Sequence, residues 1–431
     1  MILGLSSNAQ RAVFVAASFA VALFLSYFSI RNALASHYAD LHTAEAYERA
    51  VLLEPANPRN WYLLGRYWQY NLENPDSARA IRSYLSALSL NPGSSDTWLD
   101  LASAYEAEGN AVAARDAFQH AKKVYPLSAD VSWRYGNFLL RQEELEPAFS
   151  EMRQAVEADP QRAAEAFSRS LRVGSSVETI LDRVLPPSSE AYVDVIWDQT
   201  TDGHTGNALK VWGRLVAIHP QVPLRDVFPL ISSLRNSKQI PDARRVWNQA
   251  VVVAGMADLE GPPGSLLWDG GFESGVTGGG YSWLLPEGLR NVQISIDGQE
   301  KHSGKHSLRL TFDGKSIVTS TDICHYVPVS PSSSYRFSAW VRTSAVTTDE
   351  GIRFQLRSLG TEDSSVAVTP ELHGSEPWTH IEISWSSRKD VQEVQVCLVR
   401  SLSDQLENKI KGTIWVDDVA LVPEAVEHRK P

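Results

Sequence analysis

Two carboxylates stand side by side near the C-terminal end of the sequence, in the segment TIWVDDVALV. A glycosidase places two such groups on either side of one glycosidic bond. Asp417 and Asp418 are neighbours in a segment that alternates like a strand, and successive side chains of a strand point to opposite faces. We therefore expect the sheet to separate these two carboxylates, so that they do not form a catalytic pair.

Other arrangements typical of enzymes are missing from the sequence. It contains no H-E-x-x-H, G-x-S-x-G or P-loop motif. Its two cysteines, Cys324 and Cys397, exclude a Cys-rich zinc site and leave either one disulfide or two free thiols. His325 adjoins Cys324, but a neighbour in sequence is no evidence of a Cys–His couple. We predict that the protein is not an enzyme.

One predicted strand face mixes an aromatic side chain with polar ones. In YRFSAWVRT, Trp340 alternates with Arg336 and Arg342, a composition that a core face would not tolerate. An exposed aromatic ring can bury a large apolar area against a ligand, and neighbouring polar groups can form hydrogen bonds with it. The alternative is that the tryptophans only pack. The candidate glycan-binding residues, on this polar face or in a Gly-rich loop at its rim, are Trp340, Trp378, Tyr281, Trp283, Arg336, Arg353, Gln355, Arg357 and Glu382. The arginines would suit a polymer that carries carboxylates.

These candidates lie in a region with a two-residue period. The opposite, apolar face of YRFSAWVRT contains Tyr335, Phe337, Ala339 and Val341, and in HIEISW it contains Trp385 with two isoleucines. Short alternating strands with turn residues between them predict an all-β jelly-roll sandwich over 266–423. The Pro- and Gly-rich segment 259–265 is expected to be a linker, and 424–431 a C-terminal tail.

The order of motifs in this region resembles carbohydrate-binding modules of the family 4/9 type, which are galactose-binding-like jelly rolls. The motifs are DGGFESG with YSW, HSGKHSLRL, YRFSAWVR, EPWTHIEI and IWVDDVAL. The resemblance implies that Glu273 and Asp417 bring the ends of the domain together and hold a structural calcium ion, with carbonyl groups near the HSGKHS turn. The alternative is that both carboxylates cap turns or accept backbone N–H bonds without a metal, so no cofactor is required.

The region before the sandwich repeats itself. It fits W-x2-L-[GA]-x2-Y followed by A-x3-F-x2-A-x4-P, most fully at Trp98, Leu101, Ala102, Tyr105, Ala114, Phe118, Ala121 and Pro126. This pattern resembles the tetratricopeptide repeat (TPR), which implies an all-α solenoid over 36–258 that binds a peptide or protein in its concave groove. The signature residues are packing residues. No Lys/Arg cluster at groove positions marks a carboxylate clamp, and the partner stays unidentified.

The N-terminal region predicts a membrane segment. Residues 12–30 carry no charge, and at about 1.5 Å per residue this segment is nearly 30 Å long, enough to cross a bilayer core. Ala33-Leu34-Ala35 has the A-x-A form that signal peptidase cleaves. We favour an uncleaved signal anchor over 11–31, with a cytoplasmic tail at 1–10, because the apolar run is long and Arg31 separates it from that triplet. The bulk of the chain would then be extracytoplasmic, in the periplasm if the membrane is a bacterial inner membrane.

The expected architecture is multidomain: a transmembrane (TM) helix, a TPR solenoid and a jelly-roll sandwich. The net charge of −11 argues against nucleic-acid binding, which usually requires a basic stripe. The domain combination suggests a membrane-anchored adaptor that holds a protein and a polysaccharide, as in assembly or export of a cell-surface polysaccharide. The alternative is a purely structural protein–protein scaffold whose jelly roll binds no sugar.

Overall fold

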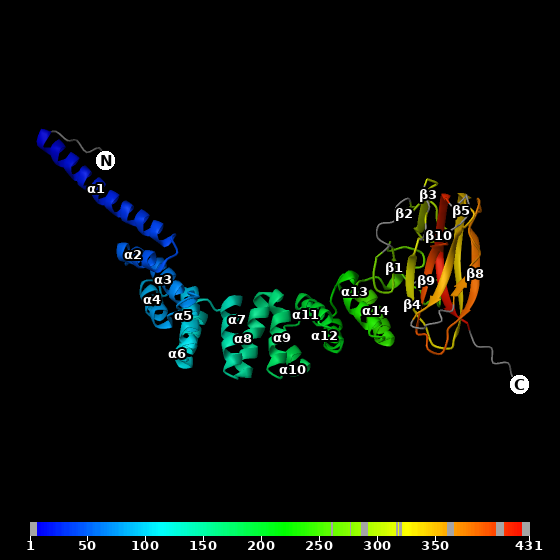
Figure 1. Ribbon diagram of the computed structural model, residues 1–431, viewed down its shortest axis with the longest axis horizontal. Coiled ribbons are helices and arrows are strands. Elements are labelled where there is room, and N and C mark those ends of the chain that lie inside the picture. The colour runs from blue at the N-terminus through cyan, green and yellow to red at the C-terminus, as the bar shows by residue number, and fades with distance from the viewer. Residues whose placement is uncertain are drawn as a thin grey trace. The chain divides into compact units, whose positions relative to one another are not determined.

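The computed structural model describes residues 7–259, 262–275, 277–285, 292–315, 318, 321–359, 366–401 and 409–424. The chain divides into two compact units, Met1–Pro186 and Pro187–Pro431. The first unit is helical, and the second joins four helices to a β-sandwich (Figure 1). The expected linker 259–265 lies inside the second unit, with residues 260 and 261 outside the described part. Most of the two expected tails, 1–6 and 425–431, also lies outside it.

Helix α1 (Asn8–Ala39) contains the whole predicted membrane segment and is long and apolar enough to cross a bilayer. A capping box starts it: Ser7 accepts a hydrogen bond from the Gln10 backbone, and the Gln10 side chain accepts one from the Ser7 backbone. The helix is longer than the predicted anchor, because no Gly or Pro interrupts it between Arg31 and Ala39.

The rest of the first unit is a series of antiparallel helical hairpins, as the repeats predict. Their helices are α2 (Ala44–Leu53), α3 (Pro58–Tyr70), α4 (Ser77–Leu90), α5 (Ser95–Ala107), α6 (Ala111–Val124), α7 (Ala129–Arg141), α8 (Leu145–Ala158), the 3₁₀ turn η1 (Pro160–Arg162), α9 (Ala163–Arg172) and α10 (Val177–Arg183). Small residues allow the two helices of a hairpin to approach. A Cβ atom at Gly65 would lie 2.6 Å from the ring of Tyr84, and Ala114 is fully buried.

Two further hairpins begin the second unit. They are α11 (Ser189–Thr201) with α12 (Thr205–Ala217), and α13 (Phe228–Asn236) with α14 (Ile240–Val253), accompanied by the 3₁₀ turns η2 (Leu224–Val227) and η3 (Ala257–Leu259). The degenerate repeat residues Ala208, Trp212, Ala243 and Trp247 are all buried between these helices or at their end.

The sandwich consists of two antiparallel sheets in the described part of the chain. Their orders are β1-β4-β9-β6-β7, here called sheet I, and β2-β3-β10-β5-β8, here called sheet II. The strands are β1 (Trp283–Leu284), β2 (Val292–Asp297), β3 (Ser307–Asp313), β4 (Ile323–Pro328), β5 (Ser334–Thr347), β6 (Ile352–Ser358), β7 (Val366–Val368), β8 (Thr379–Ser386), β9 (Glu393–Arg400) and β10 (Lys411–Pro423).

The apolar faces of the two sheets meet and form the core, as the alternation predicts. Tyr335, Phe337, Ala339 and Val341 of β5 are buried there, and so is Trp385. Cys324 and Cys397 face each other on β4 and β9 and form a disulfide. His325 points to the other side of β4, where burial lowers its pKa to about 4. Its Nδ1 and Nε2 atoms lie 2.8 and 3.1 Å from the backbone oxygens of Tyr326 and Trp268, and the neutral ring donates its one N–H to one of them.

The sandwich packs against the last helical hairpin, where a further repeat would otherwise lie (Figure 1). In a regular repeat, Phe118 of α6 contacts Tyr135 of the following helix α7 at 5.5 Å between ring centroids. Trp247 holds the corresponding place on α14, and its ring centroid lies 5.3 Å from Trp268 and 6.1 Å from Tyr281 of the sandwich. The sandwich therefore caps the apolar end of the helical array.

The Gly-rich loop predicted to hold a binding rim makes this contact. A Cβ atom at Gly279 would lie 2.1 Å from the ring of Phe228, and one at Gly280 would lie 2.4 Å from the ring of Trp247. Arg235 of α13 also reaches the sandwich, where it pairs with Glu393 at 2.7 Å. The glycines are present because the helices come too close for any side chain.

Candidate functional site

Four aromatic rings gather on the outer face of sheet II. Trp340 of β5 stacks on His302, with ring centroids 3.8 Å apart and planes 12° apart. His380 lies opposite Trp340 on the neighbouring strand β8, with ring centroids 5.2 Å apart. The ring of Trp378 meets the ring of His302 edge-on, with centroids 5.8 Å apart. All four side chains are at least partly exposed. The structure thus brings together two predicted tryptophans, and adds two histidines that sequence analysis missed.

A cavity of about 560 Å³ opens beside Trp340. Its wall consists of Leu259, Pro262, Pro263, Asp269, Gly271, Glu273, Ser303, Gly304, Ser338, Trp340, His380 and Asp418. This volume falls within the usual range of small-ligand pockets, about 300–1,000 Å³. The lining combines carboxylates and hydroxyls with the rings of Trp340 and His380, which is the combination that a sugar needs.

The two adjacent carboxylates of β10 face the same turn, so the expectation that they point to opposite faces is wrong. The pairing of β10 with β5 shifts between Asp417 and Ala420, and Asp418 has a φ of 47°. This bulge breaks the alternation. Asp417 Oδ2 accepts N–H bonds from His302 and Ser303 at 2.8 and 3.0 Å, while Asp418 Oδ2 lies 2.6 Å from the His302 ring nitrogen.

The environment of Asp417 disfavours its charge. Its side chain is fully buried, and this burial raises its pKa to about 6. The N–H bonds from Ser303 and His302 act in the opposite direction, while the neighbouring charge of Asp418 adds to the rise. Asp417 therefore holds the turn at 302–303 in place at an electrostatic cost.

The predicted calcium ligands are occupied by hydrogen bonds. Glu273 Oε1 accepts N–H bonds from Lys305 and His306 at 2.6 and 3.3 Å, and its Oε2 lies 3.3 Å from the His306 ring nitrogen. Both oxygens of Asp417 also accept backbone N–H bonds. Within the described residues no group of three or more His, Cys, Asp or Glu side chains is arranged to hold a metal. N–H groups repel a cation, so these residues fit the metal-free alternative better than a calcium site.

The polar candidates divide between the two outer faces of the sandwich. Arg336 and Glu382 lie on sheet II, near Trp340. Arg353, Gln355 and Arg357 lie on β6 of sheet I, on the far side of the core. The prediction of one shared polar face was wrong, because strand alternation identifies a face but not the sheet to which it belongs.

Carboxylates already pair with the candidate arginines. Arg336 lies 3.1 Å from Glu424, and Arg353 lies 2.5 and 2.6 Å from Glu350 and Glu371. Arg357 bonds Gln355 at 2.6 Å. Among the described residues, the wall of the cavity beside Trp340 contains carboxylates and no Lys or Arg. This arrangement does not favour an acidic polymer as the ligand.

Tyr281 and Trp283 are buried, so the expectation that they line an exposed rim is wrong. Trp283 donates a hydrogen bond to the backbone oxygen of Asp269 at 3.1 Å and stacks on Phe272 inside the core. Tyr281 faces α14 and the guanidinium of Arg235, and burial raises its pKa. The loop sequence is compatible with an exposed binding rim and also with a loop packed against a helix. The tertiary contact with Trp247 distinguishes these two arrangements.

The helices of the first unit share a buried carboxylate. Asp100 of α5 accepts hydrogen bonds from Tyr62 of α3 at 3.0 Å and from Arg134 of α7 at 2.9 Å, and Arg66 lies 3.8 Å from it. Burial raises the pKa of Tyr62 to about 12, and the charge of Asp100 adds to this rise. Asp100 therefore joins α3, α5 and α7, which are the first helices of three successive hairpins.

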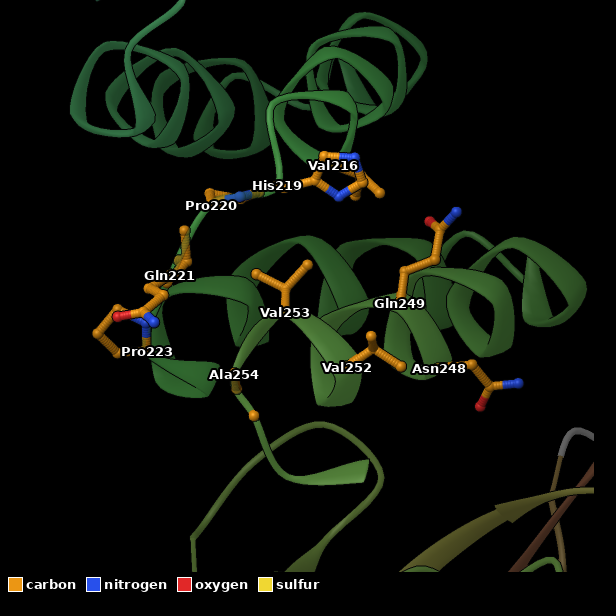
Figure 2. A pocket seen from close by; sticks show the side chains of 12 residues that line it. Val216, His219, Pro220, Gln221, Pro223, Asn248, Gln249, Val252, Val253 and Ala254 are labelled. Atoms are coloured by element: carbon orange, nitrogen blue, oxygen red, sulfur yellow. The ribbon is translucent and has the colours of Figure 1, made fainter. Parts of the chain in front are cut away.

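Two further cavities lie along the helices of the second unit. One of about 940 Å³ lies between the end of α12 and α14, where Val216, Val252 and Val253 form apolar walls (Figure 2). The other, of about 480 Å³, adjoins the half-exposed Trp197 of α11. Both include the extended segment 221–223.

Residues 69–123 match the tetratricopeptide-repeat family model. No curated protein matches the sequence. Similar solved structures include a family 16 carbohydrate-binding module, with 16% identity over 36% of this chain and 99% of that chain and a TM-score of 0.27. They also include a structure titled "CBM4 structure and function", with 12% identity, 37% and 99% coverage and a TM-score of 0.27. YrrB, described as a TPR protein with an unusual peptide-binding site, shows 15% identity, 49% and 94% coverage and a TM-score of 0.26.

The matched TPR segment contains α4, α5 and α6, and hence Asp100. Arg141 of α7 makes a second bridge to this segment, with its Nε atom 2.6 Å from Glu106 of α5. Arginines do occur on the TPR helices, but the hydrogen bonds within the array already engage those that face Asp100 and Glu106.

Proposed function

We propose that this protein is a non-enzymatic, membrane-anchored adaptor whose TPR-like helices bind a protein and whose sandwich binds a glycan. The observation that carries the glycan part is the cavity of about 560 Å³ beside the partly exposed ring of Trp340. A sugar unit in this cavity would lay an apolar face on the indole and turn its hydroxyls toward Ser303 and Asp418.

The outer face of sheet II is the better of the two sandwich faces for this role. On sheet I, the guanidinium carbon of Arg235 lies 3.5 Å from the centroid of the Tyr326 ring. Helix α13, which carries Arg235, therefore covers part of that face. The predicted polar residues of sheet I, Arg353, Gln355 and Arg357, have no exposed aromatic ring beside them among the described residues. Ring stacking, the main source of affinity, is offered by the partly exposed indoles of Trp340 and Trp378 in the described part of the outer face of sheet II.

Two features of the chain support an extracytoplasmic compartment. A disulfide such as Cys324–Cys397 persists in an oxidising environment, which supports a location of the sandwich outside the cytoplasm. The A-x-A triplet lies inside α1, and Ala35 is fully buried against the neighbouring helix, which supports an anchor that stays attached. In a bacterium this corresponds to the inner membrane with a periplasmic bulk, a setting suited to assembly or export of a surface polysaccharide.

One observation favours the second candidate function, a protein–protein scaffold whose sandwich binds no sugar. The sandwich caps the helical array through Trp247, Trp268 and Tyr281, which is a structural role in itself. His302 also covers one face of Trp340, so a glycan must either use the cavity side of the ring or displace the histidine.

A glycan array with the full-length protein in detergent micelles tests the proposal. The parent protein and Trp340→Ala are compared, with Trp197→Ala on α11 as the matched control, because it removes a half-exposed indole that does not line the cavity. We expect the parent and the control to retain the same glycans and Trp340→Ala to lose them. Binding of no glycan by any of the three proteins would support the scaffold function.

A further inference from the structure

The end of α1 folds against α2 as a helical hairpin. Beyond Arg31, α1 continues to Ala39, and α2 then runs back along it, with Ala39, Tyr47, Ala50 and Val51 in a shared core. Nine residues of α1 from Arg31 to Ala39 span about 12 Å, close to the length of α2. The C-terminal end of α2 therefore returns to the level of Arg31, where the apolar segment of α1 ends.

Arg31 joins the two helices at this level. Its Nε atom donates to the backbone oxygen of Leu53 at 3.0 Å, and its Nη2 atom donates to the same oxygen. The Tyr27 ring lies 5.6 Å below the guanidinium. The last carbonyl groups of a helix lack partners within the helix and are costly to place in an apolar medium. Arg31 supplies a charged partner for one of them, as an environment of low polarity requires.

The turn that follows has the composition of a membrane interface. We define residues 52–61, from the end of α2 to the first turn of α3, as the basal turn. Leu52 is 78% exposed, because no other part of the described chain covers its side chain. Trp61 donates its indole N–H to the backbone oxygen of Pro55 at 2.8 Å, and Arg59 is exposed. Leu52 and Arg59 are exposed and Trp61 is partly exposed, and Leu, Trp and Arg side chains are typical of the boundary between headgroups and acyl chains.

We propose that the basal turn lies in the lipid headgroup region of the membrane that α1 crosses, so that the first helical hairpin rests on the bilayer. This inference depends on the proposed membrane span of α1. The occupant is the bilayer itself, because α1 continues without interruption from its apolar segment into the hairpin and Arg31 holds the basal turn at the boundary. The solenoid then begins at the lipid surface without a flexible linker.

The test places an environment-sensitive fluorophore on single introduced cysteines of the full-length protein. The protein is reconstituted in vesicles of phosphatidylcholine and phosphatidylglycerol that contain a lipid with a headgroup nitroxide. The positions are Leu52→Cys in the basal turn, Leu72→Cys as the matched control, and Phe19→Cys inside α1. Leu72 is the same residue type and fully exposed, and it lies at the opposite end of α3.

We expect the fluorophore at position 52 to emit at shorter wavelengths than the fluorophore at position 72. We also expect the nitroxide to quench it about twofold or more strongly, because position 52 would be buried in the interface. If the label at 52 behaves like that at 72 while the label at 19 reports lipid, the basal turn lies in water and this inference is overturned, although the anchor stands. If the label at 19 also reports water, α1 does not span the bilayer, and the anchoring part of the proposed function fails together with this inference.

Discussion

The imidazole of His302 lies flat on the indole of Trp340, with ring centroids 3.8 Å apart. The histidine belongs to the turn before β3 and the tryptophan to β5, and Asp418 of β10 holds the histidine at 2.6 Å. This contact places a side chain of the protein where the ring of a sugar could stack.

Removal of the histidine ring is expected to strengthen glycan binding. In His302→Ala the second face of Trp340 becomes free, and a ring contact of this kind is worth roughly 0.5–1.5 kcal/mol, which corresponds to a roughly two- to tenfold lower Kd. Isothermal titration of the full-length protein measures this change. His120→Ala, which removes an imidazole stacked on Trp98 among the TPR-like helices and not in the wall of the cavity, is the control and should leave the Kd unchanged. Equal or weaker binding by His302→Ala would show that the histidine belongs to the site.

The pH dependence of stability reports on Asp417. Its pKa is about 6 in the folded protein and close to 3.9 in an unfolded chain, so the folded state holds the proton more tightly. The contribution of this raised pKa to the free energy of unfolding is fully present below about pH 4 and is lost as the pH rises through about 6.

Asp417→Asn does not titrate, so its stability should improve relative to the parent between pH 4 and pH 7. Two units of pKa correspond to at most about 3 kcal/mol in the free energy of unfolding. Urea denaturation of both proteins at several pH values measures the difference. Curves of stability against pH that stay parallel for the two proteins would contradict the raised pKa.

Calcium is expected to have no effect on the melting temperature. The carboxylate oxygens of Glu273 and Asp417 already accept N–H bonds, which a bound cation would have to displace. Thermal melts of the full-length protein in millimolar calcium and in chelator should therefore coincide. A higher Tm with calcium would mean that the folded state binds the ion, and it would support the calcium site that the motif resemblance implies.

The contact between helix and sandwich should be sensitive to one added methyl group. Gly280→Ala places a Cβ atom 2.4 Å from the ring of Trp247, whereas the same change at Gly278 meets no atom within 4 Å. Both glycines have positive φ values, 62° and 79°, so backbone strain is common to both variants. Overpacking should make Gly280→Ala less stable than Gly278→Ala by about 1–3 kcal/mol in a denaturation experiment. Equal stabilities would mean that Trp247 does not pack against this loop.

Periodic packing made much of this fold predictable. Ala114 and Phe118 recur at repeat spacing because the helices of every hairpin meet in the same way, and both are buried as expected. The alternation in β5 likewise assigned Phe337 to the core and Trp340 to the surface. Such patterns reflect local geometry that one strand or helix possesses by itself.

The candidate site depends on contacts that no local pattern contains. Alternation could not show that Arg353 and Trp340 belong to different sheets, and it fails at Asp418, where a bulge turns the carboxylate toward His302. Trp283 directly follows a Gly-rich loop in the sequence, but in the fold it begins strand β1 and is buried. His302 was missed because its partner Trp340 is distant in sequence. The one available signal was the motif resemblance, which placed the turn at 302–307 near Glu273 and Asp417.

The affinity of a glycan identified by the array, measured for Trp340→Ala against Trp197→Ala in the full-length protein, tests the central claim most directly. Because the ring supplies most of the contact, we predict a Kd at least about tenfold higher for Trp340→Ala, with unchanged affinity for Trp197→Ala and normal melting of both variants. A folded Trp340→Ala protein that binds the glycan as tightly as the parent would contradict the proposed sugar site.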